Sequence, residues 1–411
     1  MFKHALVQEA AYNTLLRSQR QELHARIAKG LEAQFPEVVE VEPETLARHY
    51  AEADLVDVAV DYWNRAGVRA LQRSAHLEAA GHLTHALTLI KRIKPGRNRS
   101  QLELDLQVSL ASALHSIKGQ SAPEVADAYQ RARQLCEEVD DPQQLFRVLM
   151  GLYRFYGGRM HGDIAFEIVE QLYSLAEQSG DSDLLLQGHM ALGTIQLLWG
   201  DLDAAQHHLD AAITRYAPDS HRSHAVRFNI DPGILSLSRA SWALWFRGYP
   251  DQAVELDNRT LALARRLGHA QSLGMALCFS AALYQFRREP TLAQAIAQEA
   301  AEVSGEHRFA QYAAEEGFLL GWAVTELGQS EAGFAQMRQS FFEYRRLDVA
   351  LDLPWYLGLL AEVSSSRGEV DEGLALLDEA EDITRTNVRT SLHLPEWHRI
   401  KGELLLASAH P

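Results

Sequence analysis

Apolar side chains recur along most of the chain with the period of an α-helix. Between residues 202 and 216 one helical stripe is apolar, and Asp203, Gln206, His207 and Asp210 face the other way. The apolar stripe consists of Leu202, Ala205, Leu209, Ala212, Ile213 and Tyr216. No segment rich in Val, Ile and Thr alternates apolar and polar residues over the length of a strand, so the pattern predicts an all-α protein.

A second pattern places a small residue, a large residue four positions later, and a small residue three positions after that. This spacing keeps the three residues on one helix face, where the small ones let neighbouring backbones approach. The copies are Ala59-Trp63-Ala66, Ala79-Leu83-Ala86, Ala205-Leu209-Ala212, Ala293-Ala297-Ala300, Gly333-Met337-Ser340 and Gly373-Leu377-Ala380. The last three copies are 40 residues apart, which indicates a repeat protein.

The helix before several of these copies has a signature of its own. A Leu-Gly or Leu-Ala pair is followed by a turn glycine, and in some copies an acidic residue follows that glycine at the start of the next helix. Examples are Leu192-Gly193 with Gly200-Asp201, Leu320-Gly321 with Gly328, and Leu360-Ala361 with Gly368-Glu369. The glycine favours a left-handed helix end and the acid favours a helix N-terminus, so each unit is predicted to be helix, tight turn, helix.

These leucine-glycine, turn-glycine and small-large-small positions resemble the tetratricopeptide repeat, with a period longer than is usual for that family. The resemblance implies a right-handed α-solenoid of stacked antiparallel helix pairs, in which function resides on a curved surface. We expect residues 41–411 to form one such superhelix. The match is weakest between Asp251 and Gly268, where the small-large-small pattern breaks down.

Longer stretches resemble the tetratricopeptide C-terminal region of bacterial signalling proteins that carry a class III adenylate or guanylate cyclase domain and an AAA (STAND-type) ATPase. The stretches are 2–12, 46–50, 59–63, 242–245, 248–253 and 401–406. The resemblance implies that residues 1–40 correspond to the end of an ATPase-linked helical domain. It also implies a regulatory partnership with cyclase or ATPase domains, in the same polypeptide or another. Met1 falls within an apparent helix, so we expect this chain to be part of a larger system.

Composition excludes several classes of function. The formal net charge is −16, which argues against a nucleic-acid surface. Only Cys136 and Cys278 are present, so a disulfide framework and a cysteine zinc site are not expected, and a reducing compartment is implied. The N-terminus does not resemble a signal peptide, and no apolar run is long enough to span a bilayer. We therefore expect a cytoplasmic chain with no membrane partner.

No motif indicates catalysis or a cofactor. The chain lacks any Gly-Lys pair and hence a phosphate-binding Walker loop, and it lacks Gly-x-Ser-x-Gly. The histidine pairs His82/His85, His207/His208 and His221/His224 are interpreted as solvated helix faces, because no acid or cysteine at helical spacing completes a metal site. We expect no catalytic residue, no metal and no cofactor.

Aromatic and arginine clusters are the candidates for a binding groove. One includes Tyr153 and Tyr156 with Arg154 and Arg159, and another surrounds Trp242 and Trp245. Such residues anchor binding surfaces, although at helical spacing they are more often core. A connection ending in Asp231-Pro232-Gly233 is a further candidate. The predicted groove residues are Tyr153, Tyr156, Asp231, Trp242, Trp245, Tyr284 and Arg287.

Three functions remain open at this stage. The leading hypothesis is a non-catalytic interaction and sensing module that regulates a nucleotide cyclase or ATPase. The alternatives are a self-standing scaffold that binds peptide or protein partners, and a small-molecule sensor of the kind found on transcription regulators. An enzyme with an unrecognised helical active site has no positive support.

Overall fold

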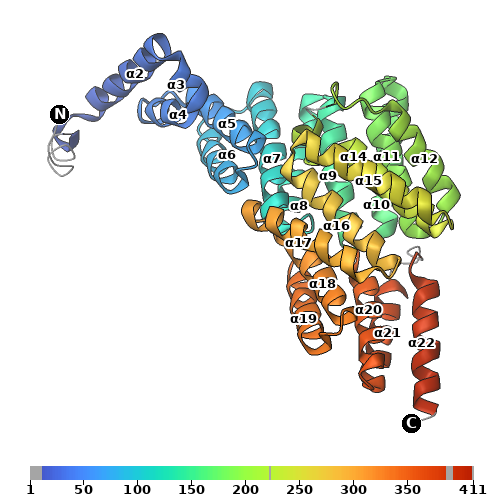
Figure 1. Ribbon diagram of the computed structural model, residues 1–411. Helices are drawn as coiled ribbons and strands as arrows, with labels where there is room; N and C mark the ends of the chain where they lie inside the picture. The colour runs from blue at the N-terminus through green and yellow to red at the C-terminus, as the bar shows by residue number, and fades with distance from the viewer. Residues whose placement is uncertain (1–11, 222–223, 386–391, 410–411) are drawn as a thin grey trace. The chain divides into compact units, whose positions relative to one another are not determined.

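The computed structural model describes residues 12–221, 224–385 and 392–409, and within them the chain is α-helical with no strand (Figure 1). The helices are α2 (Arg17–Gln34), α3 (Pro36–Val41), α4 (Pro43–Glu52), α5 (Val56–Gln72), α6 (His76–Ile90), α7 (Arg97–Lys118), α8 (Pro123–Val139), α9 (Pro142–Gly158), α10 (Gly162–Ser179), α11 (Ser182–Trp199), α12 (Leu202–Arg215), α13 (His224–Phe228), α14 (Pro232–Phe246), α15 (Pro250–Leu267), α16 (Ala270–Phe286), α17 (Pro290–His307), α18 (Ala310–Glu326), α19 (Ser330–Arg346), α20 (Leu353–Ser366), α21 (Val370–Arg385) and α22 (Leu394–Ala409). The predicted all-α solenoid of antiparallel helix pairs is confirmed. In the part of the chain that the structure covers, no helix is both long and apolar enough to cross a membrane.

The chain forms two compact units. The first contains the described residues up to Ala113 together with Arg131–Asp140, and the second contains Leu114–Gln130 and the residues from Asp141 on. The boundary predicted at residue 40 lies inside the first unit and stays a prediction. The second unit contains the candidate functional site, and it is described by itself below.

The small-large-small residues form the contacts between the helices of each pair, as the sequence predicts. All of them are buried, from Ala59 in the first unit to Ala380 in the second. Gly193 shows why the residue after the leucine of the Leu-Gly pair is small. A Cβ at this position would lie 2.7 Å from Cγ of Leu209 on the next helix. The two backbones can approach this closely only without a side chain between them.

The turn glycines adopt the left-handed conformation that the sequence predicts. The φ angles are 81° at Gly200, 93° at Gly328 and 79° at Gly368. After the first of these turns, Asp201 caps α12, because its side chain accepts a hydrogen bond from the backbone N–H of Ala204 at 3.2 Å. Two residues therefore separate α11 from α12, and three separate α18 from α19 and α20 from α21.

The interruption of the pattern in α15 has a specific cause. Its three positions are Ala253, Asp257 and Thr260, and all three are buried. The hydroxyl of Ser280 donates a hydrogen bond to Asp257 Oδ2 at 2.6 Å, and burial raises the pKa of Asp257 to about 6. A hydrogen-bonded polar pair takes the place of the large apolar residue, while the helix itself is regular.

The second unit curls until distant segments meet. The carbonyl oxygen of Gly158 accepts hydrogen bonds from the backbone N–H groups of Ala350 (2.7 Å) and Leu351 (3.1 Å). Arg159 forms an ion pair with Asp348 at 3.0 Å, across 189 positions of sequence. We call residues 347–352, between α19 and α20, the closing segment, and these interactions the closure contacts.

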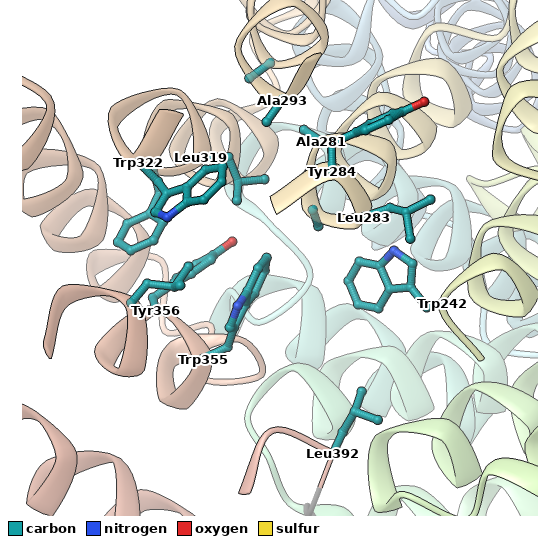
Figure 2. Packing of buried hydrophobic residues seen from close by; sticks show 14 of the residues in the cluster. Trp242, Ala281, Leu283, Tyr284, Ala293, Leu319, Trp322, Trp355, Tyr356 and Leu392 are labelled. Atoms are coloured by element: carbon teal, nitrogen blue, oxygen red, sulfur yellow. The ribbon is translucent and has the colours of Figure 1, made fainter. Parts of the chain in front are cut away.

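The core of the second unit is rich in aromatic side chains. Figure 2 shows Trp355 lying between Tyr356 and Trp242, and the ring centroids are 5.1 Å and 6.3 Å from that of Trp355. Leu319 and Trp322 of α18 pack into the same cluster. This cluster joins α14, α16, α18 and α20 into one rigid wall, against which the cavity described next is formed.

Candidate functional site

The second unit encloses a cavity of about 110 Å³, which we call the central cavity. It lies between α9, α10, α11, α14, α16, α18 and the closing segment. Most of its wall is apolar, from residues such as Ile195, Leu198, Leu235 and Phe279. Two basic and two acidic side chains also line it, and they are Arg154, Arg239, Glu315 and Asp352. A small cavity with four such groups is unusual, because buried charge is costly unless it is paired.

Arg239 is the most constrained of the four. It lies inside α14 and is only 5% exposed. Its guanidinium carbon is 4.2 Å from the ring centroid of Phe279 and 4.9 Å from that of Trp242, so both rings fix the position of the charge. No described residue accepts a hydrogen bond from its Nε or Nη1. Burial lowers the pKa of this guanidinium, and the nearby Asp352 opposes that effect.

Arg154 adds a second positive charge from α9. Its Nη1 donates a hydrogen bond to the carbonyl oxygen of Phe228, whereas no described residue accepts one from its Nη2. Burial lowers the pKa of this guanidinium as well, and the neighbouring tyrosine Tyr129 has the opposite effect. Two arginines that line the central cavity therefore have guanidinium nitrogens without a hydrogen-bond partner among the described residues.

The two acids lie on α18 and at the end of the closing segment. Glu315 is 5% exposed and accepts a hydrogen bond from Gln311 Nε2 at 2.9 Å. Asp352 Oδ2 accepts one from the Tyr344 hydroxyl at 3.2 Å. Burial, together with the charge of Asp352, raises the pKa of Glu315, and burial raises the pKa of Asp352. Among the described residues neither acid forms a direct ion pair with either cavity arginine.

A second, larger cavity of about 900 Å³ lies near α20 and α22, and we call it the C-terminal groove. Trp245, Phe286, Trp355 and His393 form its aromatic wall. Burial, and secondarily the charge of Arg239, lowers the pKa of His393 to about 4, so this imidazole is neutral at physiological pH. At its rim Arg288 and Arg399 form ion pairs with Glu362 and Glu396.

Trp242 separates the two cavities. Its ring centroid is 5.0 Å from that of Phe279, which lines the central cavity, and 5.2 Å from that of Phe286, which lines the C-terminal groove. Its Nε1 donates a hydrogen bond to the carbonyl oxygen of Phe279 at 2.9 Å. The position of Trp242 in the core is visible in Figure 2.

The predicted groove residues do not lie together in one site. Tyr153 lines the central cavity and Trp245 lines the C-terminal groove, with Trp242 between them. Tyr284 is buried in the core, and Tyr156 packs edge-on against Phe155 and His161.

The other two predicted residues have local partners. Asp231 caps α14, since its Oδ1 accepts a hydrogen bond from the N–H of Ile234 at 3.0 Å, and its Oδ2 accepts one from the Tyr216 hydroxyl. Arg287 forms an ion pair with Glu289 at 2.7 Å and lies over the ring of Trp245.

Arg239, Glu315 and Asp352 were not among the predicted site residues. One signal in the sequence points to two of them. Arg239 stands four positions after Leu235 and three before Trp242, so it occupies the buried stripe of α14. Glu315 stands three positions after Tyr312 and four before Leu319, so it occupies the buried stripe of α18 in the same way. A charge at such a position is expensive and therefore suggests a functional site.

The interpretation of the histidine pairs as solvated is wrong for one pair. His221 and His224 are 6% and 3% exposed, and their Nε2 atoms lie 3.1 Å and 3.0 Å from the carboxylate oxygens of Asp183. This acid comes from the neighbouring helix α11, which helical spacing alone does not reveal. No group of three His, Cys, Asp or Glu side chains in the described ranges is placed to hold a metal ion.

No thiol near the cavity is activated for nucleophilic chemistry. Burial, reinforced by the charges of Glu315 and Glu316, raises the pKa of the Cys278 thiol, which keeps it protonated. The side chains of the central cavity can therefore bind and neutralise a charged ligand, and they do not form a nucleophile with a base.

Comparison with known proteins agrees with the fold. No protein-family model matches the chain. An uncharacterized protein of Rhizobium meliloti (strain 1021) is 24% identical over 383 residues, which are 92% of this chain and 37% of that protein. The chain thus spans little more than a third of the length of this relative.

Two solved structures are similar in fold. A Rap protein complexed with competence and sporulation factor matches with a TM-score of 0.53 and 12% identity, over 86% of this chain and 99% of that one. The apo form of RapI matches with a TM-score of 0.50 and 12% identity, over 70% of this chain and 98% of that one. At such identity these likenesses establish the tetratricopeptide-like solenoid alone.

Proposed function

We propose that this chain is a non-catalytic sensing and protein-interaction module, in which a ligand that enters the central cavity controls the conformation of the second unit. The observation that carries the proposal is Arg239, a buried guanidinium in contact with two aromatic rings, with two nitrogens that lack a hydrogen-bond partner among the described residues. A buried charge of this kind is stabilised by an anionic group at hydrogen-bond distance, which none of the described acidic side chains supplies.

The closing segment gives the sensor a conformational output. Asp352 lines the central cavity, and Asp348 and Ala350 of the same segment make closure contacts with Arg159 and Gly158. A ligand held between Arg239 and Asp352 would stabilise the closed curl relative to open forms. The ligand would then shift the population of the two forms, because it interacts differently with each.

We infer that the regulated partners are nucleotide-cyclase or ATPase domains, in the same polypeptide or another, and that the module acts in the cytoplasm without binding nucleic acid. The sequence resemblance described above supports this role. The Rap structure supports the general idea, because a protein of similar fold has been crystallised with a competence and sporulation factor. An in-frame nucleotide-binding motif in the coding sequence immediately upstream would add further support.

The proposal is tested by thermal unfolding of the purified chain in the presence of defined compounds from four classes: amino acids, organic acids, nucleotides and sugars. At a concentration of about 100 times Kd, a ligand stabilises the fold by about 2.7 kcal/mol, which corresponds to a rise in Tm of about 3 °C or more. The rise is expected for the wild type and for Arg247→Gln, a matched control on the exposed end of α14, but not for Arg239→Gln.

Two results would overturn the proposal. One is that no class of compound raises Tm, or that each raises it equally in Arg239→Gln. The other is turnover of ATP or GTP by the purified chain above background, which would show catalysis. Small-angle scattering provides the conformational readout, with a smaller radius of gyration expected when the ligand is bound.

A further inference from the structure

The charges and the size of the central cavity together specify a class of ligand. We propose that the cavity binds a free α-amino acid with an apolar side chain, whose carboxylate is held by Arg239 and whose ammonium group is held by Asp352 and Glu315. This inference rests on the proposed function, since it names the ligand of the same sensing site.

The volume limits the ligand to a small molecule. A buried water needs roughly 10–15 Å³ of such space, so a cavity of about 110 Å³ accepts about seven to eleven non-hydrogen atoms. Leucine and methionine each have nine. A nucleotide or a peptide of several residues exceeds this volume.

The charge balance favours a zwitterion over a simple anion. The cavity contains two guanidinium groups and two carboxyl groups, and none of the four is paired directly with another. A ligand with only a carboxylate would satisfy the arginines and would leave Glu315 and Asp352, whose pKa values are raised by burial, without a cationic partner. A ligand with both groups satisfies each side and leaves the net charge of the cavity unchanged.

The geometry of each polar group fits this assignment. Phe279 and Trp242 both contact the Arg239 guanidinium, which lines the cavity and has nitrogens without a hydrogen-bond partner among the described residues, so it can donate to a carboxylate. On the other side, Asp352 Oδ2 is occupied by the Tyr344 hydroxyl, while its Oδ1 accepts no hydrogen bond from the described residues. That oxygen can accept a hydrogen bond from an ammonium group.

The remaining wall includes polar residues such as Thr194 and Gln120, and its apolar part suits an apolar side chain. Ile195, Leu198, Leu235 and Met275 line the cavity and offer no further charge. A polar or charged ligand side chain would lose its hydration against these residues without compensation. The site therefore favours leucine or methionine over serine, aspartate or lysine.

Isothermal titration calorimetry of the wild-type chain with L-leucine and three related compounds tests the inference without any mutation. L-Leucine is expected to bind, while L-leucinamide, which lacks the carboxylate, and 4-methylpentanoate, which lacks the ammonium group, are each expected to bind at least tenfold more weakly. Tri-leucine, which is too large, is expected to show no binding. Equal affinity of either truncated analogue, or tight binding of tri-leucine, would overturn the assignment.

Two variants test which residue binds the carboxylate of the ligand and which binds its ammonium group. Arg239→Gln is expected to weaken leucine binding at least tenfold and to leave the weak affinity for leucinamide unchanged, whereas Asp352→Asn is expected to weaken leucine and to spare 4-methylpentanoate. Arg247→Gln is the control that should bind leucine as the wild type does. The thermal melt without ligand shows whether each variant is folded.

The outcome also separates this inference from the proposed function. If a nucleotide, sugar or organic acid binds in an Arg239-dependent manner and leucine does not, the ligand class is wrong and the sensing role stands. If no compound depends on Arg239, both are wrong.

Discussion

Glu316 offers a quantitative test of the electrostatics of the core. It lies on α18, is 0% exposed, and accepts a hydrogen bond through Oε1 from the Ser304 hydroxyl at 2.8 Å. Its Oε2 has no hydrogen-bond partner among the described residues. Burial raises the pKa of this carboxyl from its ordinary 4.5 to about 8, so the protonated form is strongly favoured in the folded state.

The sign of the pH effect follows from this direction. A carboxyl whose pKa is higher in the folded chain contributes stability that is fully present below pH 4.5 and is lost as the pH rises through about 8. At about 1.4 kcal/mol per pH unit, the change from 4.5 to about 8 corresponds to a loss of about 5 kcal/mol. At pH 7 the loss is already about 3 kcal/mol.

Glu316→Gln should remove this loss. Glutamine keeps the acceptor for Ser304 and cannot ionise, so the difference in unfolding free energy between variant and wild type should grow by about 5 kcal/mol from pH 4.5 to pH 9. Urea denaturation followed by tryptophan fluorescence at five pH values measures it. Glu302→Gln, an exposed position on α17, is the matched control and should show no such growth. A difference that is constant across the pH range would refute the reasoning.

Two further predictions concern packing and buried hydrogen bonds, and both are measured by urea denaturation at neutral pH. Gly321→Ala should destabilise the chain by about 1–3 kcal/mol, because its Cβ would lie 2.8 Å from the backbone nitrogen of Met337, whereas Gly305→Ala, with nothing within 4 Å, should stabilise it by about 0.5–1 kcal/mol. Effects of the same sign would contradict the close approach of α18 and α19. Asp183→Ala should cost about 2 kcal/mol, because it removes the acceptor of two buried imidazoles, whereas Asp203→Ala, whose side chain is 91% exposed, should cost less than about 0.5 kcal/mol. Equal losses would show that the buried histidines do not depend on Asp183.

The repeat architecture was predictable because it depends on local spacing. The small-large-small residues, the turn glycines such as Gly200 and the acidic cap Asp201 act within one or two helical turns of their own positions. A period of that kind is visible in a single sequence. Even the weakest stretch, around Asp257, departs from the pattern for a local reason, a polar pair with Ser280 of the next helix.

The cavity was not predictable, because it depends on how far the solenoid curls. The contact of Arg159 with Asp348 joins positions 189 residues apart, and no local period encodes it. The helix faces that meet at the centre follow from that closure. The same limit applies to His221 and His224, since their partner Asp183 lies on another helix.

Arg239 was missed for a different reason. The first twelve residues of α14, from Pro232 to Ala243, are all buried, so the helix has no polar face against which an inward charge would stand out. In an amphipathic helix an arginine is expected to face solvent. In this stretch of α14 no residue faces solvent, so that expectation fails for Arg239. The available signal was the helical spacing of Arg239 from Leu235 and Trp242. This signal can be used only once the helix is known to be buried.

The cost of these charges argues for a ligand. A buried ion pair can usually be replaced by apolar residues of similar volume with little loss or with a gain in stability, and unpaired buried charges are more expensive still. In a solenoid each helix pair is stabilised mainly by the neighbouring pairs. A charge in the buried stripe of one helix therefore destabilises that part of the array, and contacts in distant repeats do not offset the loss. Here four such defects, on α9, on α14, on α18 and in the closing segment, converge on one cavity of about 110 Å³. Independent defects would be scattered along the array, and convergence on one small space is what a binding site for a charged molecule requires.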